Sequence, residues 1–209
     1  MRVKVLTERP MGRKIIKILK SLGEEIVEDN PDMLIVAYYS RIIKPEEFNA
    51  PRLGTINLHP GLLPYNRGMY PHIWPLIDDT PAGITIHYID DQIDHGEIIA
   101  QEEVEVKITD TAGSLEKRIQ KRMLFLFKLV WISKFWFNVP VKQMGKGTLH
   151  YAKEILTIQR FDKDTIMRLR ACTFDDRSYG YFLHEGQRIY VGAKFFTQDD
   201  IDKFNETNK

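Results

Sequence analysis

The first part of the chain alternates between strand-like runs and one amphipathic helix. Residues 33–38 form a continuous apolar run, which is typical of a strand that helices cover on both faces of a parallel sheet. Residues 3–6 form a shorter strand. Between the two strands, apolar residues recur at helical spacing: Ile15, Ile18, Leu19 and Leu22. Gly23 follows where this helix would end. This order predicts an α/β protein with a mostly parallel sheet and helices on both faces.

The middle of the chain adds further strands and helices to this pattern. Strands are predicted at residues 55–59, 84–88 and 97–101. Residues 70–77 are expected to form a short helix, and a long helix is expected from Thr109 or Asp110 to about Trp136. From Met123 onward this long helix is apolar almost all round, which predicts burial on more than one side, either in the core or against another subunit.

A loop with one proline and two glycines, residues 138–148, separates two predicted parts of the chain. We expect a catalytic domain at residues 1–150 and a C-terminal extension at residues 151–209. In the extension, a short helix is predicted at residues 164–170 and a β-hairpin at residues 181–191. Because an isolated hairpin is only marginally stable, it should pack on the main domain or on a second subunit, and we expect a homodimer.

Composition narrows the class of protein without identifying it. The chain has 209 residues, 43% of them hydrophobic and 28% charged, with a formal net charge of +1, which gives no support to a large nucleic-acid surface. The single cysteine, Cys172, excludes an internal disulfide and fits a reducing compartment. No secretory signal is recognised, and the most apolar segment, residues 123–137, is shorter than the roughly 18 apolar residues that a spanning helix needs. We therefore expect a cytoplasmic protein without a membrane segment.

Two polar side chains share one face of the predicted strand 55–59, close to its end. Asn57 and His59 are two residues apart, and Pro60 and Gly61 then end the strand. In an open parallel sheet, ligands bind at the carboxyl ends of the strands. A glycine-rich phosphate loop of the usual Gly-x-Gly-x-x-Gly or Walker type does not follow the first strand. The candidate chemistry therefore centres on Asn57 and His59.

Asp94, in the loop after the next strand, adds a carboxylate to this pair. An amide and a histidine can both face one developing oxyanion, and a nearby carboxylate raises the pKa of an imidazole and holds it protonated. This set suits transfer of a one-carbon acyl group to an amine, and one preorganised oxyanion donor is typically worth roughly 3–4 kcal/mol of barrier. Taken alone, such a set of three residues is more often structural than catalytic.

Several longer motifs carry a family resemblance across residues 31–106. The run 57–64 (Asn-Leu-His-Pro-Gly-Leu-Leu-Pro), followed by Arg67-Gly68, by Gly83-Ile84-Thr85-Ile86-His87 and by Ile93-Asp94-His95-Gly96-Glu97-Ile98, resembles the formyltransferases that use 10-formyltetrahydrofolate. This family includes glycinamide ribonucleotide, methionyl-tRNA and nucleotide-sugar formyltransferases. The resemblance implies a Rossmann-like formyltransferase fold and an enzyme that transfers a one-carbon group.

The resemblance also assigns roles to individual residues. Asn57, His59 and Asp94 match the catalytic Asn, His and Asp of the family. Six residues are expected to bind N10-formyltetrahydrofolate as a co-substrate. They lie in a loop after residues 33–38 and on the far wall of the pocket: Tyr39, Arg41, Ile42, Ile43, Asp90 and Asp91. The family uses no metal, and the spacing of His59, Asp94 and His95 fits no standard zinc site, so no metal is expected.

Departures from the relatives favour a nucleotide-linked amino sugar as the acceptor. The Ser/Gly-rich phosphate loop of the glycinamide ribonucleotide enzymes is replaced by residues 7–12 (Thr-Glu-Arg-Pro-Met-Gly), and too few residues follow Gly147 for the C-terminal domain of the tRNA enzymes. We expect formylation of dTDP-4-amino-4,6-dideoxyglucose for O-antigen or other surface polysaccharide synthesis. The candidate substrate-binding residues are Tyr65, Asn66, Arg67, Gly68, Tyr70 and His72.

Three alternatives remain open from the sequence. The acceptor could be methionyl-tRNA or another amine, although no nucleic-acid partner is expected. Water could replace the amine, which would make the protein a 10-formyltetrahydrofolate hydrolase that releases formate. The chain could also be a catalytically silent folate- or nucleotide-binding module, against which the intact Asn57, His59 and Asp94 argue.

Overall fold

The computed structural model describes residues 1–134, 140–158, 162, 164–167 and 181–192. The chain divides into two compact units, Met1–Glu154 and Ile155–Lys209, and each is described by itself. The first unit contains the sheet and all of the residues proposed for catalysis.

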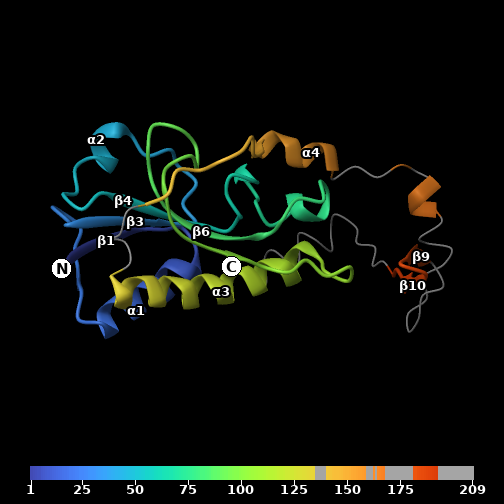
Figure 1. The fold of residues 1–209 in the computed structure, drawn as a ribbon, viewed down its shortest axis with the longest axis horizontal. Helices are drawn as coiled ribbons and strands as arrows, with labels where there is room; N and C mark the ends of the chain where they lie inside the picture. The colour runs from blue at the N-terminus through green and yellow to red at the C-terminus, as the bar shows by residue number, and fades with distance from the viewer. Residues whose placement is uncertain (135–139, 159–161, 163, 168–180, 193–209) are drawn as a thin grey trace, which may run out of the picture. The chain divides into compact units, whose positions relative to one another are not determined.

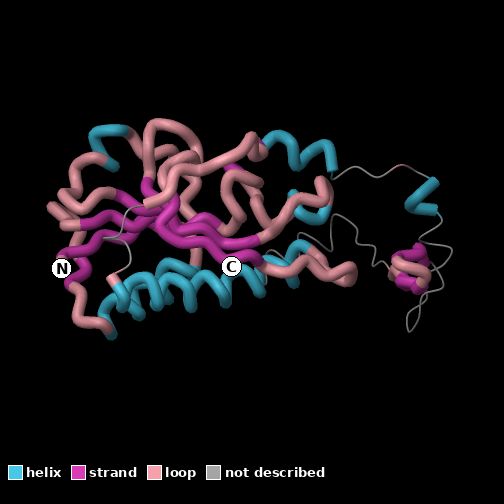
Figure 2. The backbone as a smooth tube through the Cα atoms, viewed as in Figure 1, coloured by secondary structure: helices cyan, strands magenta, loops and turns pink. Residues whose placement is uncertain are grey.

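A six-stranded sheet with the order β2-β1-β3-β4-β6-β7 forms the centre of the first unit (Figures 1 and 2). The strands are β1 (Arg2–Leu6), β2 (Glu25–Ile26), β3 (Met33–Ala37), β4 (Thr55–His59), β6 (Gly83–Tyr88) and β7 (Ile98–Glu103). The first four are parallel to one another, whereas β6 pairs antiparallel with β4 and β7 pairs antiparallel with β6. The predicted α/β architecture is therefore confirmed, with antiparallel pairing confined to one side of the sheet.

The two long helices, α1 (Pro10–Ser21) and α3 (Ala112–Ser133), lie along one face of the sheet in Figure 1. The short helix α2 (Pro45–Phe48) and the connecting loops lie on the other face. Thr111 caps α3 by accepting a hydrogen bond from the Ser114 N–H, so the cap is one or two residues later than the sequence suggested. The predicted end of this helix at Trp136 lies outside the described residues.

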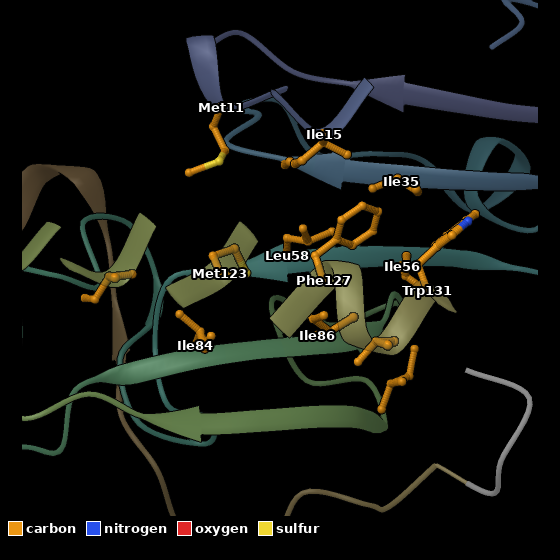
Figure 3. Packing of buried hydrophobic residues seen from close by; sticks show 14 of the residues in the cluster. Met11, Ile15, Ile35, Ile56, Leu58, Ile84, Ile86, Met123, Phe127 and Trp131 are labelled. Atoms are coloured by element: carbon orange, nitrogen blue, oxygen red, sulfur yellow. The ribbon is translucent and has the colours of Figure 1, made fainter. Parts of the chain in front are cut away.

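The core fills the space between the sheet and the two long helices (Figure 3). Ile56 and Leu58 of β4 and Ile84 and Ile86 of β6 meet Phe127 of α3 and are almost completely buried. In the second half of α3 the burial is one-sided. Phe125, Leu129 and Ile132 are about half exposed on its other face, so the described residues do not bury this helix on several sides, and the alternative of a subunit interface stays a prediction.

A helix predicted at residues 70–77 is reduced to a single 3-10 turn, η1 (Trp74–Leu76). Tyr70 has a positive φ of 58°, which a helix does not allow, and proline at 71 and 75 removes backbone donors. Close to this segment, β5 (Arg67–Gly68) pairs in parallel with β8 (Leu149–His150), and Trp74 stacks on His150 with ring centroids 4.0 Å apart. The loop after β4 is therefore tied to a segment some eighty residues later in the chain.

The second unit contains the predicted hairpin. It consists of β9 (Tyr181–His184) and β10 (Gln187–Tyr190), which pair antiparallel. Glu185 and Gly186 both have positive φ, as a two-residue hairpin turn of type I′ requires. This unit also contains α4 (Ile155–Ile158), and of the predicted helix at 164–170 the described residues 164–167 are helical.

Among the described residues, no helix combines the length and the apolar character that crossing a bilayer would require.

Candidate active site

The structure brings the three predicted catalytic residues together at the end of β4. The amide Nδ2 of Asn57 donates to Asp94 Oδ1 over 3.0 Å, and Nδ1 of His59 lies 3.4 Å from Asp94 Oδ2. His59 is 3% exposed, whereas Asn57 is partly accessible. Asp94 therefore contacts both other residues with its two carboxylate oxygens, and Asn57 and Asp94 are both more accessible than His59.

His87 of β6 joins this group as a fourth residue. In the antiparallel register it lies directly opposite Asn57, and its Nε2 is 3.2 Å from Asn57 Nδ2 and 3.5 Å from Asp94 Oδ1. Its Nδ1 lies 2.8 Å from the Tyr88 carbonyl oxygen, which only accepts, so Nδ1 carries the proton and Nε2 accepts from Asn57. The sequence showed His87 only as part of a motif, because its role depends on strand register.

The two amide hydrogens of Asn57 therefore have one acceptor each, Asp94 and His87. This fixes the orientation of the side chain, since a flipped amide would place its oxygen against the Asp94 carboxylate. The bond to the ionised carboxylate is the stronger of the two. The hydrogen that faces His87 is consequently the one that an incoming oxyanion could attract.

His59 is held in a single tautomer by the loop that follows β4. Its Nε2 lies 3.0 Å from the Asn66 carbonyl oxygen, so this nitrogen carries a hydrogen and Nδ1 faces Asp94. Gly61 makes this placement possible, because a Cβ atom on Gly61 would lie 2.6 Å from His59 Nε2.

Burial and neighbouring groups shift the pKa values of His59 and Asp94 in opposite directions. Burial lowers the pKa of His59 below its ordinary value of 6.5, although the Asp94 carboxylate opposes this effect. For Asp94, burial would raise the pKa, but His59, His87 and the Gly68 N–H together lower it. The resting site therefore holds Asp94 ionised, while burial and the Asp94 carboxylate act against each other on the pKa of His59.

The backbone around Asp94 shows how tightly the carboxylate is placed. Asp94 has a φ of 46°, in the left-handed region that is uncommon for residues other than glycine. The Gly68 N–H donates to Asp94 Oδ2 over 2.9 Å, and Gln143 Nε2 donates to the Asp94 carbonyl oxygen over 2.8 Å. Gly68 was predicted to bind substrate, whereas in the structure its N–H contacts the carboxylate of the site. No sequence pattern indicated Gln143.

The candidate cofactor-binding residues lie in two loops. Tyr39, Arg41, Ile42 and Ile43 follow β3, where Arg41 donates to the Tyr39 hydroxyl and Ile42 is 84% exposed. Because β3 and β4 are adjacent and parallel, this loop leaves the same edge of the sheet as His59. Asp90 and Asp91 belong to the loop that ends at Asp94, and Asp90 binds His95 over 2.7 Å.

The candidate substrate-binding residues differ in how far they can meet a ligand. Tyr65 is 40% exposed, and Arg67 Nε is buried without a hydrogen-bond partner among the described atoms. Tyr70 and His72 are partly buried, and burial lowers the pKa of His72.

Asn66, by contrast, is fully buried, and its side chain binds Thr80, Thr148 and the Pro81 carbonyl oxygen. Asn66 therefore holds its loop and has no surface to offer a substrate.

In the described part of the chain, no group of three His, Cys, Asp or Glu side chains is arranged to hold a metal ion.

Comparison with known proteins identifies the family of the chain. A model of the formyl transferase family matches residues 4–126. The dTDP-4-amino-4,6-dideoxyglucose formyltransferase of Mycobacterium tuberculosis (strain ATCC 25618 / H37Rv) is 35% identical over 148 residues, which are 65% of this chain and 62% of that protein. The methionyl-tRNA formyltransferase of Fusobacterium nucleatum is 40% identical over 101 residues, 48% of this chain and 33% of that protein. The chain thus spans less than two thirds of the length of these relatives.

Two solved structures share the fold over most of the chain. PseJ from Anoxybacillus kamchatkensis, in complex with UDP-4,6-dideoxy-4-formamido-L-AltNAc and tetrahydrofolate, is 28% identical with a TM-score of 0.71, covering 78% of this chain and 93% of PseJ. Rv3404c of Mycobacterium tuberculosis is 23% identical with a TM-score of 0.72, covering 94% of this chain and 98% of that one, and supports the fold alone. With a family match over more than half of its length, the chain belongs to the formyl transferase family.

Proposed function

We propose that the protein transfers the formyl group of N10-formyltetrahydrofolate to the amine of a nucleotide-linked amino-deoxy sugar, with dTDP-4-amino-4,6-dideoxyglucose favoured. The observation that carries this proposal is the contact of Asp94 with both Asn57 and His59 at the carboxyl end of β4. The product would serve O-antigen or other surface polysaccharide synthesis.

The donors and acceptors of the site fit both reacting groups. Asn57 and His59 supply N–H groups for a carbonyl oxygen that becomes negative, and ionised Asp94 supplies an acceptor for an amine that becomes positive. N10-formyltetrahydrofolate supplies the formyl group. In the chain itself, the loop with Tyr39, Arg41, Ile42 and Ile43 and the loop with Asp90 and Asp91 would hold this co-substrate.

The resting hydrogen bonds indicate how the oxyanion is stabilised. Asn57 keeps its charge-assisted bond to Asp94 and turns its second hydrogen from neutral His87 to the oxyanion, which is the stronger acceptor. His59 can release the Asn66 carbonyl and donate from Nε2 in the same way. Asn57 is therefore already oriented before charge develops, whereas His59 must exchange its contact with the Asn66 carbonyl.

Asp94 directs the transfer of the proton that the attacking amine loses. Its pKa is held low, so it is ionised and can hydrogen-bond the attacking amine and guide the lost proton to a water, and a proton is delivered to N10 of the co-substrate as the bond between N10 and the formyl carbon breaks. His59 Nδ1 faces the same carboxylate at 3.4 Å and can take up the proton when negative charge forms nearby.

Support for a sugar acceptor comes from the relatives. Both the Mycobacterium tuberculosis enzyme at 35% identity and PseJ at 28% identity have names or ligands that refer to 4-amino- or 4-formamido-dideoxy sugars linked to a nucleotide. The methionyl-tRNA formyltransferase is matched over only 33% of its length.

A panel of acceptors tests the proposal. The protein is incubated with N10-formyltetrahydrofolate and, in turn, dTDP-4-amino-4,6-dideoxyglucose, GDP- and UDP-linked amino sugars, initiator methionyl-tRNA, or buffer alone. We expect tetrahydrofolate release that depends on an amino sugar. Transfer only to tRNA, or formate release in buffer alone, would replace the proposal by the corresponding alternative. Folate binding with no reaction in any mixture would indicate a silent binding module.

A further inference from the structure

We propose that Gln143 is a positioning residue for Asp94, and that residues 141–150, hereafter the strap, hold the two loops of the site in register. This inference rests on the function proposed above. The strap lies beyond residues 4–126, which the family model matches.

Gln143 uses both hydrogens of its amide on the Asp94 loop. Its Nε2 donates to the Asp94 carbonyl oxygen over 2.8 Å and to the Gly96 carbonyl oxygen over 3.0 Å. Its Oε1 is buried and has no hydrogen-bond partner among the described atoms. The side chain therefore acts as a double donor toward two carbonyls that only accept, and it touches the backbone of Asp94 and not the carboxylate.

The Asp94 loop needs such a support because its backbone is constrained. The φ of 46° at Asp94 lies in the left-handed region, which is uncommon for residues other than glycine. Two residues later the chain passes so close to β6 that a Cβ on Gly96 would lie 1.8 Å from the Tyr88 carbonyl oxygen. A small shift of this turn would move the carboxylate of Asp94 away from Asn57 and His59.

The strap itself is fixed on the sheet next to Gln143. The Ile98 N–H donates to the Val141 carbonyl oxygen over 2.7 Å, and the Val141 N–H donates to the Ile98 carbonyl oxygen over 2.9 Å. Ile98 begins β7, so this pair of bonds attaches the strap to the six-stranded sheet. Gln143 thus transmits the position of the sheet to the Asp94 loop.

The other end of the strap reaches the acceptor of His59. Thr148 Oγ1 accepts from the Asn66 N–H over 2.7 Å, and the Thr148 carbonyl oxygen accepts from the Arg67 N–H over 3.0 Å. Asn66 provides the carbonyl oxygen that faces His59 Nε2. One segment therefore positions both the carboxylate on one side of the His59 ring and the carbonyl on the other.

The proposal predicts a loss of rate without loss of binding. Gln143→Met keeps the length of the side chain and removes both donors. A displacement of a catalytic group by about 1 Å can cost about 100-fold in rate, so we expect kcat to fall roughly 10- to 100-fold. The KM for the sugar should stay within about twofold, because Gln143 Nε2 donates to backbone carbonyl oxygens of the Asp94 loop. Gln120→Met on α3, which removes one hydrogen bond to Glu116, is the matched control.

A second readout follows the geometry directly and needs no substrate. The charge of Asp94 raises the pKa of His59 against the effect of burial. If Gln143→Met lets Asp94 move away, the pKa of His59 measured by NMR titration should fall below that of the unaltered protein, whereas Gln120→Met should leave it unchanged. His87 also faces the pair, and its signal is followed in the same spectra.

Unchanged kcat together with an unchanged His59 pKa in Gln143→Met would overturn the proposal, as would a rise in KM with kcat preserved. If thermal unfolding shows that Gln143→Met does not fold, Gln143→Ala, which leaves room for water at the two carbonyls, is measured by the same criteria. If the unaltered protein transfers formyl to no acceptor, the proposed function fails, while the NMR titration still decides whether Gln143 positions Asp94.

Discussion

Asn57 is held by two acceptors of unequal strength, an ionised carboxylate and a neutral imidazole. The bond to Asp94 at 3.0 Å fixes the amide, and the contact with His87 at 3.2 Å occupies the hydrogen that a substrate oxyanion would take. A site built in this way is oriented before the reaction and exchanges only its weaker contact during it.

The balance of burial and charge at His59 gives a prediction that needs no substrate. Burial lowers the pKa of His59 and Asp94 raises it, so Asp94→Asn should lower this pKa further. NMR titration of the His59 imidazole measures the change, and Asp91→Asn, in the same loop, serves as the control. A higher pKa in Asp94→Asn than in the unaltered protein would refute this electrostatic description.

The lowered pKa of His59 in the folded protein also makes stability depend on pH. Because the folded state disfavours protonated His59, the unfolded chain binds the proton more readily, and stability is lost as the pH falls through the ordinary value of 6.5. His59→Gln should reduce this loss, and urea denaturation at pH 7.5 and 5.5 would reveal it. An equal loss in both proteins would show that other groups dominate.

Gly61 gives a steric prediction. In Gly61→Ala, the new Cβ would lie 2.6 Å from His59 Nε2 and 3.1 Å from Pro71 Cβ, so the ring must move away from the Asn66 carbonyl. We expect kcat to fall by about 100-fold, as for a catalytic group displaced by about 1 Å, in a folded protein. Gly113→Ala on α3, where the nearest atom is 3.9 Å from the new Cβ, should retain the rate. Equal activity of the two variants would contradict the role of Gly61.

Among the elements, α3 supplies the clearest test of the core. Phe127 is completely buried against β4 and β6, whereas Phe125 on the same helix is 52% exposed. Phe127→Ala should lower the free energy of unfolding by about 3–5 kcal/mol, and Phe125→Ala should cost well under half of that. Chemical denaturation compares the two, and similar losses would mean that the exposed face of α3 is covered in solution.

Elements and contacts that depend on local sequence patterns could be predicted, whereas those that depend on residues far apart in the chain could not. The apolar run of β3 and the helical spacing of α1 were sufficient to predict these elements, and Asn57 and His59 share a face of β4 because a strand alternates. The pairing of His87 with Asn57 and the contact of Gln143 with Asp94 depend on strand register and on a strap fifty residues away. The predicted helix at residues 70–77 failed because a positive φ at Tyr70 and two prolines override its apolar spacing.

At the level of the whole molecule, the predicted homodimer remains to be measured. The hairpin of the second unit exposes apolar and aromatic side chains, with Leu183 66% and Tyr190 57% exposed, which a second copy could cover. We expect light scattering at micromolar concentration to give twice the mass of one chain, and Leu183→Lys to weaken the dimer more than Arg188→Lys does. A monomer before any substitution would refute the homodimer.

Formyl transfer to dTDP-4-amino-4,6-dideoxyglucose, followed as tetrahydrofolate release in the unaltered protein and in Asn57→Ala, tests the proposed chemistry most directly. Losing one preorganised oxyanion donor costs roughly 3–4 kcal/mol, so the substitution should slow transfer by about 100- to 1,000-fold while circular dichroism and folate binding stay unchanged. Sugar-dependent transfer that persists at the full rate in Asn57→Ala would show that the chemistry does not take place at the end of β4.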